Sequence, residues 1–287
     1  MLGHLAARTT RLLLGTGIVN VYSRTPALLA MAAATLDEAS GGRAVLGLGT
    51  SGRAVVEGWH GVPMARPLAR LRETTEAVRA VVRRERRGFE GEIVRIAPAF
   101  RLSFRTPRDR IPIWHACLTP RAIRQCGEVA DGWLPSLLGP AELATDLAHA
   151  LEGLRRAGRE RGSFTVAPLI PAIVSDDLPT ARAALKRHIA FYVGGMGNFY
   201  RDVVARHGGA DAADRVASEW AAGRRDAAAA AVPDALVDAQ ALVGTAEQCA
   251  ARLAEYRAAG ADLPIAYLPA GTDVASAETT IRALGRL

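Results

Sequence analysis

Short apolar runs alternate with longer amphipathic segments along the chain. Apolar runs bounded by glycine and proline are typical of buried strands, whereas apolar positions that recur every three or four residues are typical of helices. The strands predicted in this way cover residues 12–18, 44–48, 111–115, 132–134, 164–174 and 263–267. The predicted helices cover 26–39, a stretch that opens at Pro67, 119–129, 140–158, most of 178–259 and the end of the chain.

Strands that alternate with helices predict the α/β class, with a parallel sheet and right-handed crossovers. A doubly wound open sheet accommodates the six βα units directly, whereas a (β/α)₈ barrel requires that two units be absent. The pattern leaves both architectures open. Two segments depart from the alternation: an excursion at about 88–104, which predicts a hairpin of 93–96 with 102–104, and a helical insertion at about 178–240.

The composition is that of an ordinary globular protein, with 287 residues, 49% hydrophobic and 23% charged. The longest apolar run, 27–34, is too short to cross a bilayer, and the first residues lack a secretory pattern. Cys117, Cys126 and Cys249 are too widely spaced for a disulfide framework, and the histidines show no metal-ligand spacing. A soluble, cytoplasmic protein with no membrane partner and no metal is therefore expected.

The chain is basic, with 36 Lys and Arg against 29 Asp and Glu, and Lys186 is its single lysine. The arginine groups at 83–87 and 101–110 end a predicted helix and lie in a predicted loop. Neither predicts the basic face interleaved with aromatic side chains that nucleic-acid binding requires. A compositional bias toward arginine explains the charge, and no nucleic-acid partner is expected.

Glycine-rich strand ends carry the candidate chemistry. The run 47–52 matches the dinucleotide pattern G-x-G-x-x-G, but glycines and prolines interrupt the helix that should follow at once. A tight turn and a strand end approached by a flat cofactor are the other interpretations, and we favour the cofactor. Gly17 lies inside a predicted strand, which indicates a bulge or a ligand. Thr119 and Pro120 are suited to open a helix whose free amides favour an anion.

Several segments, in order along nearly the whole chain, resemble the luciferase-like family of flavin and deazaflavin oxidoreductases. They are 9–18, 24–26, 35–43, 46–49, 127–133 and 242–249, with Cys126 where the family pattern A-G-E-x-A-D-G has its first alanine. The branch that the chain resembles uses the deazaflavin coenzyme F420 and includes methylenetetrahydromethanopterin reductase.

The resemblance implies a single TIM-type (β/α)₈ barrel domain over 1–287, with the cofactor at the carboxyl ends of the strands. The chain begins inside a helix of the family pattern, so the first two βα units are expected to be missing. Two such units amount to roughly 55 residues, which we expect to be encoded in frame upstream of Met1. Strands 12–18 and 263–267 should then flank a gap. The family's catalytic side chain falls in the missing part, so no catalytic residue is named.

The resemblance also implies where a cofactor lies. Gly17 and Ile18 match a bulge with a non-proline cis peptide behind the ring, followed by Asn20. Residues 49–51 match positions beside the ring and ribityl chain, and 116–120 match the phosphate-side loop, although many relatives carry glycine at 118–119. The implied cofactor-binding residues are Gly17, Ile18, Asn20, Gly49, Thr50, Ser51, Ala116, Cys117, Leu118, Thr119 and Pro120.

The function implied is hydride transfer between coenzyme F420 and a small organic substrate. The alternatives are an FMN-dependent luciferase-like monooxygenase and a non-catalytic barrel remnant. Arg121 and Arg124 would assist the acidic tail of the deazaflavin. A small-molecule substrate is the expected partner, and a homodimer stays open.

Overall fold

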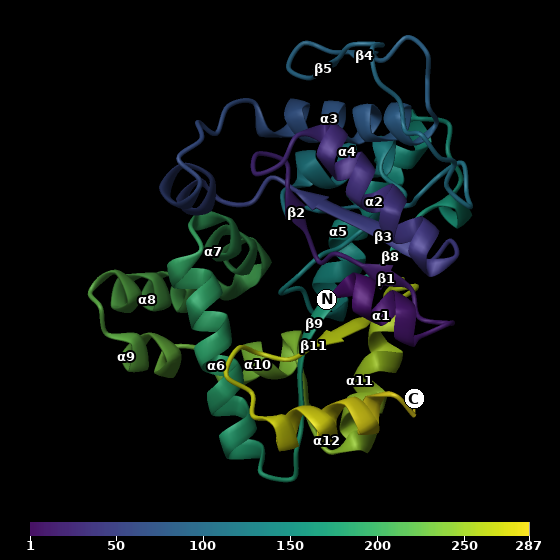
Figure 1. Ribbon diagram of the computed structural model, residues 1–287. Coiled ribbons are helices and arrows are strands. Elements are labelled where there is room, and N and C mark those ends of the chain that lie inside the picture. The colour runs from purple at the N-terminus through teal and green to yellow at the C-terminus, as the bar shows by residue number, and fades with distance from the viewer. Residues whose placement is uncertain (287) are drawn as a thin grey trace. The chain divides into compact units, whose positions relative to one another are not determined.

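The computed structural model describes residues 1–286, and they divide into two compact units (Figure 1). Unit 1 comprises residues 1–117, 121–134 and 150–164, and unit 2 comprises 118–120, 135–149 and 165–287. Each unit has its own parallel sheet and its own hydrophobic core, so each is described by itself.

The sheet of unit 1 is parallel throughout. Its central strand β3 (Ala44–Gly49) pairs on one side with β1 (Leu14–Gly15) and β2 (Val19–Asn20), and on the other with β6 (Ile113–Ala116). Strand β6 continues to β7 (Gly132–Trp133). The helices are α1 (Leu2–Arg8), α2 (Pro26–Ser40), the π-helix η1 (Ala54–Trp59), α3 (Pro67–Val82), α4 (Pro120–Val129) and η2 (Arg161–Ser163). Helix α5 (Pro140–Arg156) contributes its second half to this unit.

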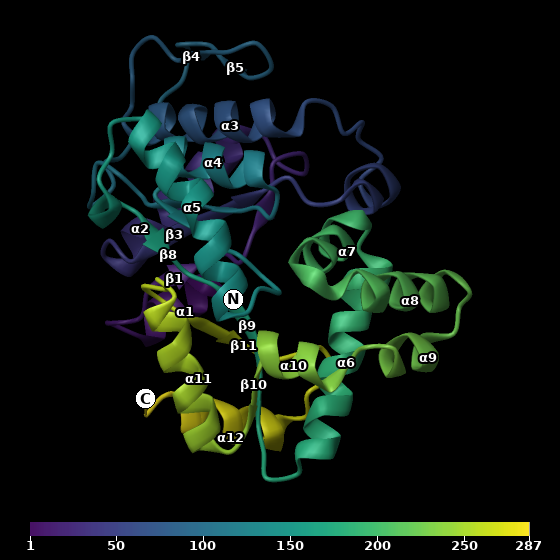
Figure 2. The same cartoon turned by 180° about the vertical axis from the view of Figure 1, so that it is seen from behind.

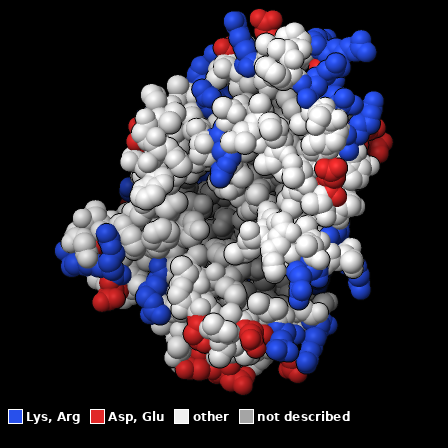
Figure 3. Space-filling view, viewed as in Figure 1, with Lys and Arg blue, Asp and Glu red and all other residues white. Residues whose placement is uncertain are grey.

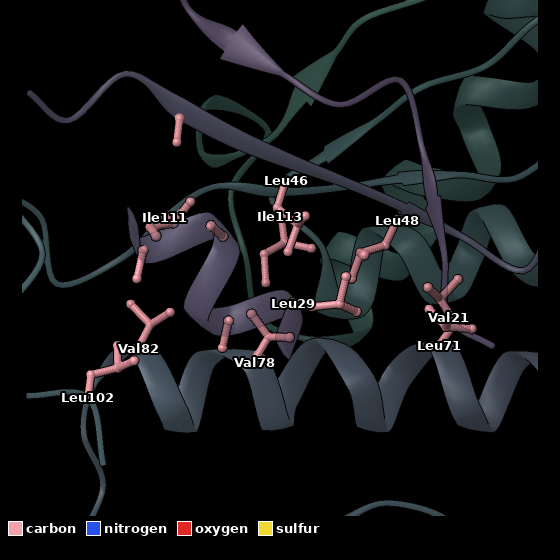
Figure 4. Close-up of a cluster of buried hydrophobic side chains, with 14 of the residues drawn as sticks. Val21, Leu29, Leu46, Leu48, Leu71, Val78, Val82, Leu102, Ile111 and Ile113 are labelled. Atoms are coloured by element: carbon pink, nitrogen blue, oxygen red, sulfur yellow. The ribbon is translucent and has the colours of Figure 1, made fainter. Parts of the chain in front are cut away.

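The core of unit 1 lies between the sheet and the helices α2 and α3. Leu46 and Leu48 of β3 and Ile113 of β6 point into it, where they meet side chains such as Leu29 and Val78 of the two helices (Figure 4). Side chains alternate between the faces of a strand, so Gly47 and Gly49 fall on the other face of β3. On β3 the leucines thus face this core, whereas Gly47 and Gly49 leave the opposite face of the strand without side chains at its carboxyl half.

Unit 2 is built around β9 (Leu169–Val174). Its first half pairs in parallel with β11 (Ile265–Tyr267) and its second half with β10 (Leu242–Gly244). The other elements, visible from both sides in Figures 1 and 2, are β8 (Thr165–Val166), α6 (Leu178–Gly195), α7 (Asn198–Val204), the π-helix η3 (Ala205–Gly209), α8 (Ala210–Ala221), α9 (Arg225–Ala230), α10 (Asp234–Gln240), α11 (Ala246–Ala258) and α12 (Val274–Leu284). A second core holds Leu185, Ile189 and Val193 of α6 against α8 and α10.

The predicted α/β class and parallel pairing are confirmed, as are most helix ends. Helix α2 begins at Pro26 and stops where Gly41 adopts the left-handed region at φ 66°. The predicted breaks occur too, since α6 ends at Gly195 and Gly208 has φ 90°. The barrel with two missing units and its single domain stay predictions. Among the described residues, no helix is long and apolar enough to cross a membrane.

Four strand predictions need correction. Leu12 and Leu13 are more than half exposed and the strand begins only at Leu14, because neither leucine has a core to face. The stretch 164–174 holds two strands, β8 and β9. The hairpin joins β4 (Phe89–Glu90) to β5 (Arg95–Ile96), and 102–104 lie outside it. The sequence pattern predicts helix where strand β10 lies, because a strand of three residues is too short to show a period of two.

Candidate functional site at the glycine-lined strand ends

A β-bulge interrupts the first strand of unit 1. Gly15 pairs with Val45 and Val19 pairs with Leu48, so three residues, 16–18, face only two residues of β3. One extra residue on one strand defines a bulge, which bends the chain and redirects its side chains. The bulge interpretation of Gly17 is therefore confirmed.

The hydroxyl group of Thr16 replaces the ladder hydrogen bonds that the bulge interrupts. It accepts a hydrogen bond from the Gly47 N–H at 2.8 Å and donates to the Gly47 carbonyl at 3.0 Å. A Cβ atom at Gly47 would lie 2.4 Å from the carbonyl oxygens of Thr16 and Gly17. Only glycine lets the bulge come this close to β3. Sequence reasoning gave Thr16 no role, although a threonine between two glycines in a strand was its signal.

The register brings three of the predicted cofactor residues into one row. Asn20 pairs with Gly49, and Gly49 pairs with Ala116, so the carboxyl ends of β2, β3 and β6 lie side by side. The side chain of Ile18 is 40% exposed and lies above Gly49, where a Cβ atom would meet Ile18 Cδ1 at 3.3 Å. The row is thus a flat backbone surface bordered by one apolar side chain.

The chain that leaves each of these strands is held in a defined turn. The Asn20 side-chain oxygen accepts hydrogen bonds from the N–H groups of Tyr22 and Ser23, at 3.0 and 2.8 Å. After β3, Ser51 adopts the left-handed region at φ 58°, and the Thr50 hydroxyl donates to its carbonyl. Non-glycine residues in that region cost free energy and gather at ligand sites. The turn places residues 50–51 at the end of the row.

The loop that follows β6 leads directly into a helix. Trp133 Nε1 donates to the Cys117 carbonyl at 2.9 Å, which fixes the chain just beyond Ala116. Helix α4 then begins at Pro120, as predicted. Within unit 2, Arg206 Nη2 donates to the Leu118 carbonyl at 3.0 Å. The Cys126 thiol is buried, and burial raises its pKa, so it acts as a packing group.

His115 of β6 is fully buried on the face covered by α3. Its Nε2 atom lies 2.8 Å from the Thr75 hydroxyl, which itself donates to the Leu71 carbonyl. Burial, and after it the charge of Arg79, lowers the pKa of His115 to about 3. The ring is therefore neutral and structural, and its strand neighbour Ala116 belongs to the row instead.

One prediction about the site is wrong. The peptide between Gly17 and Ile18 is trans, because the described chain has no cis peptide bond. A non-proline cis bond costs about 3–4 kcal/mol and persists only where the surroundings impose it, whereas Gly17 lies in open space. Arg124 donates through Nε to Glu152 at 2.7 Å, so part of its charge is already balanced, and its role toward a cofactor tail stays a prediction.

His188 of α6 makes a polar contact with a residue that is distant in the sequence. Its Nε2 atom lies 2.6 Å from the Tyr267 hydroxyl at the end of β11, in unit 2. Burial lowers the pKa of His188 to about 4. The two residues are 79 positions apart, so no local pattern announces the pair.

The structure defines a parallel α/β protein whose strand ends form a flat, glycine-lined edge. The chain belongs to the luciferase-like monooxygenase family, whose model matches residues 1–263. The resemblance inferred from the sequence is thereby confirmed.

Three named proteins are similar to this chain over most of its length, and two of them are named for coenzyme F420. A putative coenzyme F420-dependent oxidoreductase of Mycobacterium tuberculosis is 36% identical over 279 residues, which cover 90% of this chain and 79% of that protein. The 5,10-methylenetetrahydromethanopterin reductase of Methanolobus tindarius is 29% identical over 98% of this chain and 84% of its own. The solved structure of the coenzyme F420-dependent tetrahydromethanopterin reductase of Methanopyrus kandleri has a TM-score of 0.86 at 26% identity, covering 99% of this chain and 84% of that one.

Proposed function

We propose that this protein is an oxidoreductase that transfers a hydride between coenzyme F420 and a small organic substrate. The observation that carries the proposal is the row of Asn20, Gly49 and Ala116 at the carboxyl ends of β2, β3 and β6, in a chain similar to proteins named for coenzyme F420. Open α/β sheets and barrels both bind ligands at this end of their strands.

The residues present fit a flat ring system. Gly47 and Gly49 remove side chains from one face of β3, and the bulge presents Ile18 as an exposed apolar surface beside them. Gly17, Ile18, Asn20 and residues 49–51 would hold the ring side of the cofactor. Residues 116–120, from the end of β6 to the first residue of α4, would hold its phosphate side, where helix amides favour an anion.

Coenzyme F420, when bound, supplies the hydride donor or acceptor. The work of the chain is to orient the ring and to keep water from the reacting face. Thr16 and Gly47 serve the first task, because their two hydrogen bonds hold the bulge at one height above β3.

We propose the barrel of the luciferase-like family as the complete architecture, with one domain over 1–287. In this assignment the βα units of this chain match the third to the eighth units of the family barrel. The parallel pairing of β1, β3, β6 and β7, and of β9 with β10 and β11, supports it.

Substitution of Gly17 tests the cofactor site without disturbing the fold. A Cβ atom at Gly17 meets no atom within 4 Å, so Gly17→Ala is expected to fold normally but to weaken F420 binding at least tenfold. Gly58→Ala, which also meets no atom within 4 Å but lies in η1, is the matched control and should bind like the parent. Fluorescence titration of F420 measures both.

FMN titrated in parallel distinguishes the alternatives, because the backbone row accepts either ring. Tight F420 binding that Gly17→Ala weakens supports the proposal. Submicromolar binding of FMN without binding of F420 would assign the chain to the flavin monooxygenases. Binding of neither cofactor would favour the non-catalytic remnant.

A further inference from the structure

Unit 2 contains a cavity of about 640 Å³ that none of the proposed cofactor residues line. Its walls are the carboxyl end of β9, α6 from Thr180 to Phe191, the loop that follows β11 and the start of α12. Sites for small molecules in proteins commonly have volumes of about 300–1,000 Å³ and combine apolar walls with a few polar groups. The size of the cavity suits one small organic molecule.

One face of α6 forms the longest wall. Its lining residues recur every three or four positions, as expected of one helix face: Thr180, Ala181, Ala184, Arg187, His188 and Phe191. The two alanines leave the space open, and Phe191 adds an aromatic ring that is 44% exposed. This wall therefore combines apolar side chains with the polar groups of Thr180, Arg187 and His188.

His188 is the polar residue of the lining whose hydrogen-bonding pattern can be assigned. Burial raises the pKa of Tyr267, so the phenol keeps its proton. The phenol therefore donates to His188 Nε2 across 2.6 Å. Because burial lowers the pKa of His188 to about 4, the neutral ring then carries its proton on Nδ1. No described residue bonds Nδ1, which leaves an N–H donor for a ligand.

The charges around the cavity argue against an anionic ligand. Arg187 is the basic residue of the lining, and Asp176 and Asp273 are its acidic residues. The Asp273 carboxylate caps α12, because it accepts hydrogen bonds from the N–H and the hydroxyl of Ser276. The lining therefore has no excess of positive charge, and an oxygen acceptor without a full negative charge suits the donor.

We propose that this cavity binds an uncharged carbonyl compound, a ketone, ester or amide, whose oxygen accepts a hydrogen bond from His188 Nδ1 and whose apolar part packs on Ala184 and Phe191. The site is distinct from the cofactor row and uses none of its residues.

Acetophenone is the probe, and the measurement is titration of the ¹⁵N-labelled full chain by NMR, including the ring nitrogens of His188. We expect millimolar or tighter binding, with shifts at His188, Phe191 and Thr272. Two probes of the same shape serve as comparisons: α-methylstyrene lacks the oxygen acceptor, and benzoate adds a negative charge. Both should bind at least fivefold more weakly than acetophenone.

Three variants separate a ligand site from a packing role. Ala184→Phe fills the cavity and should abolish binding, whereas Ala183→Phe, at the neighbouring exposed position of α6, should leave it intact. His188→Leu should weaken acetophenone at least fivefold and leave α-methylstyrene unchanged, which a purely structural residue would not do. Absence of pocket shifts at 20 mM acetophenone, equal binding to the Ala184→Phe variant, or stronger binding of benzoate would each overturn the proposal.

Discussion

The bulge requires a residue without a Cβ atom at position 47, which is Gly47. In Gly47→Ala the new Cβ atom would lie 2.4 Å from two backbone oxygens, and backbone cannot move away as a flexible side chain can. Overpacking of this kind costs about 1–3 kcal/mol. We expect that loss in the free energy of unfolding measured with urea. Gly58→Ala, which meets no atom within 4 Å, is the control and should stay within about 0.5 kcal/mol of the parent.

His115 makes stability depend on pH. Burial, and after it Arg79, lowers its folded pKa to about 3, from about 6.5 in the unfolded chain. Between these values the unfolded chain binds the extra proton, so stability falls as the pH falls through this window and is complete above it. Because the ring is fully buried, acidification through this window should lower the free energy of unfolding by a few kcal/mol.

The variant His115→Gln isolates this contribution from the carboxylates, which titrate over part of the same range. Its unfolding free energy, measured at steps from pH 7 to pH 4, should be lower than the parent's at pH 7 and should decline less on acidification. Parallel declines in parent and variant would contradict the assignment of a neutral, buried His115.

At the scale of elements, the segment 126–132 shows why the family pattern uses these residue types. Glu128 of α4 pairs with Arg72 of α3. Asp131 accepts hydrogen bonds from the Ile113 N–H at 2.9 Å and from Arg79 at 2.8 Å, which joins the start of β6 to α3. Burial alone would raise the pKa of Asp131, but Arg79 and its other hydrogen-bond donors lower it. One short segment thus connects two helices and two strands.

Gly127 sets how closely α4 packs on the second half of α5. A Cβ atom there would lie 2.1 Å from the Ala150 carbonyl oxygen. In a helix without close neighbours, Gly→Ala stabilises the helix by about 1 kcal/mol. A destabilising Gly127→Ala would therefore show that the added methyl group collides with α5. We expect Gly127→Ala to lower the unfolding free energy by about 2–3 kcal/mol. Gly162→Ala, whose Cβ meets no atom within 4 Å, should not lower it; a neutral Gly127→Ala would disprove the close crossing.

At the scale of the whole molecule, the net charge of +7 favours anionic ligands, although the face in Figure 3 carries both signs. With Arg124 paired to Glu152, the exposed Arg121 in the first turn of α4 is the better candidate to meet an acidic tail. If F420 is the cofactor, Arg121→Gln should weaken its binding about three- to tenfold at low salt and reduce the salt dependence of binding.

Arg286→Gln removes the same charge at an exposed position of the described carboxyl end and serves as the control. Titrations of F420 at several ionic strengths compare the two variants. Equal weakening in both would mean that only net charge matters, and the local role of Arg121 would be wrong.

The sequence by itself determined the α/β class, the helix ends and the bulge. These depend on neighbours within a few positions: Pro26 and Gly41 bound α2, Pro120 opens α4, and Gly17 marks an interrupted strand. It also determined which strand ends are lined by glycine. The family resemblance implied Asn20, Gly49 and Ala116 as cofactor residues, and the strand register places them in one row.

Only the tertiary structure decided the contacts between distant residues. Thr16 meets Gly47 across 31 positions, and His188 meets Tyr267 across 79. Strands of two or three residues, such as β10, are too short to carry a period and exist because a longer strand pairs with them. Likewise, the trans peptide at Gly17 and the pairing of Arg124 with Glu152 follow from what surrounds each residue in space. Local propensity acts over one turn, whereas pairing and packing act between any residues that the folded chain brings together.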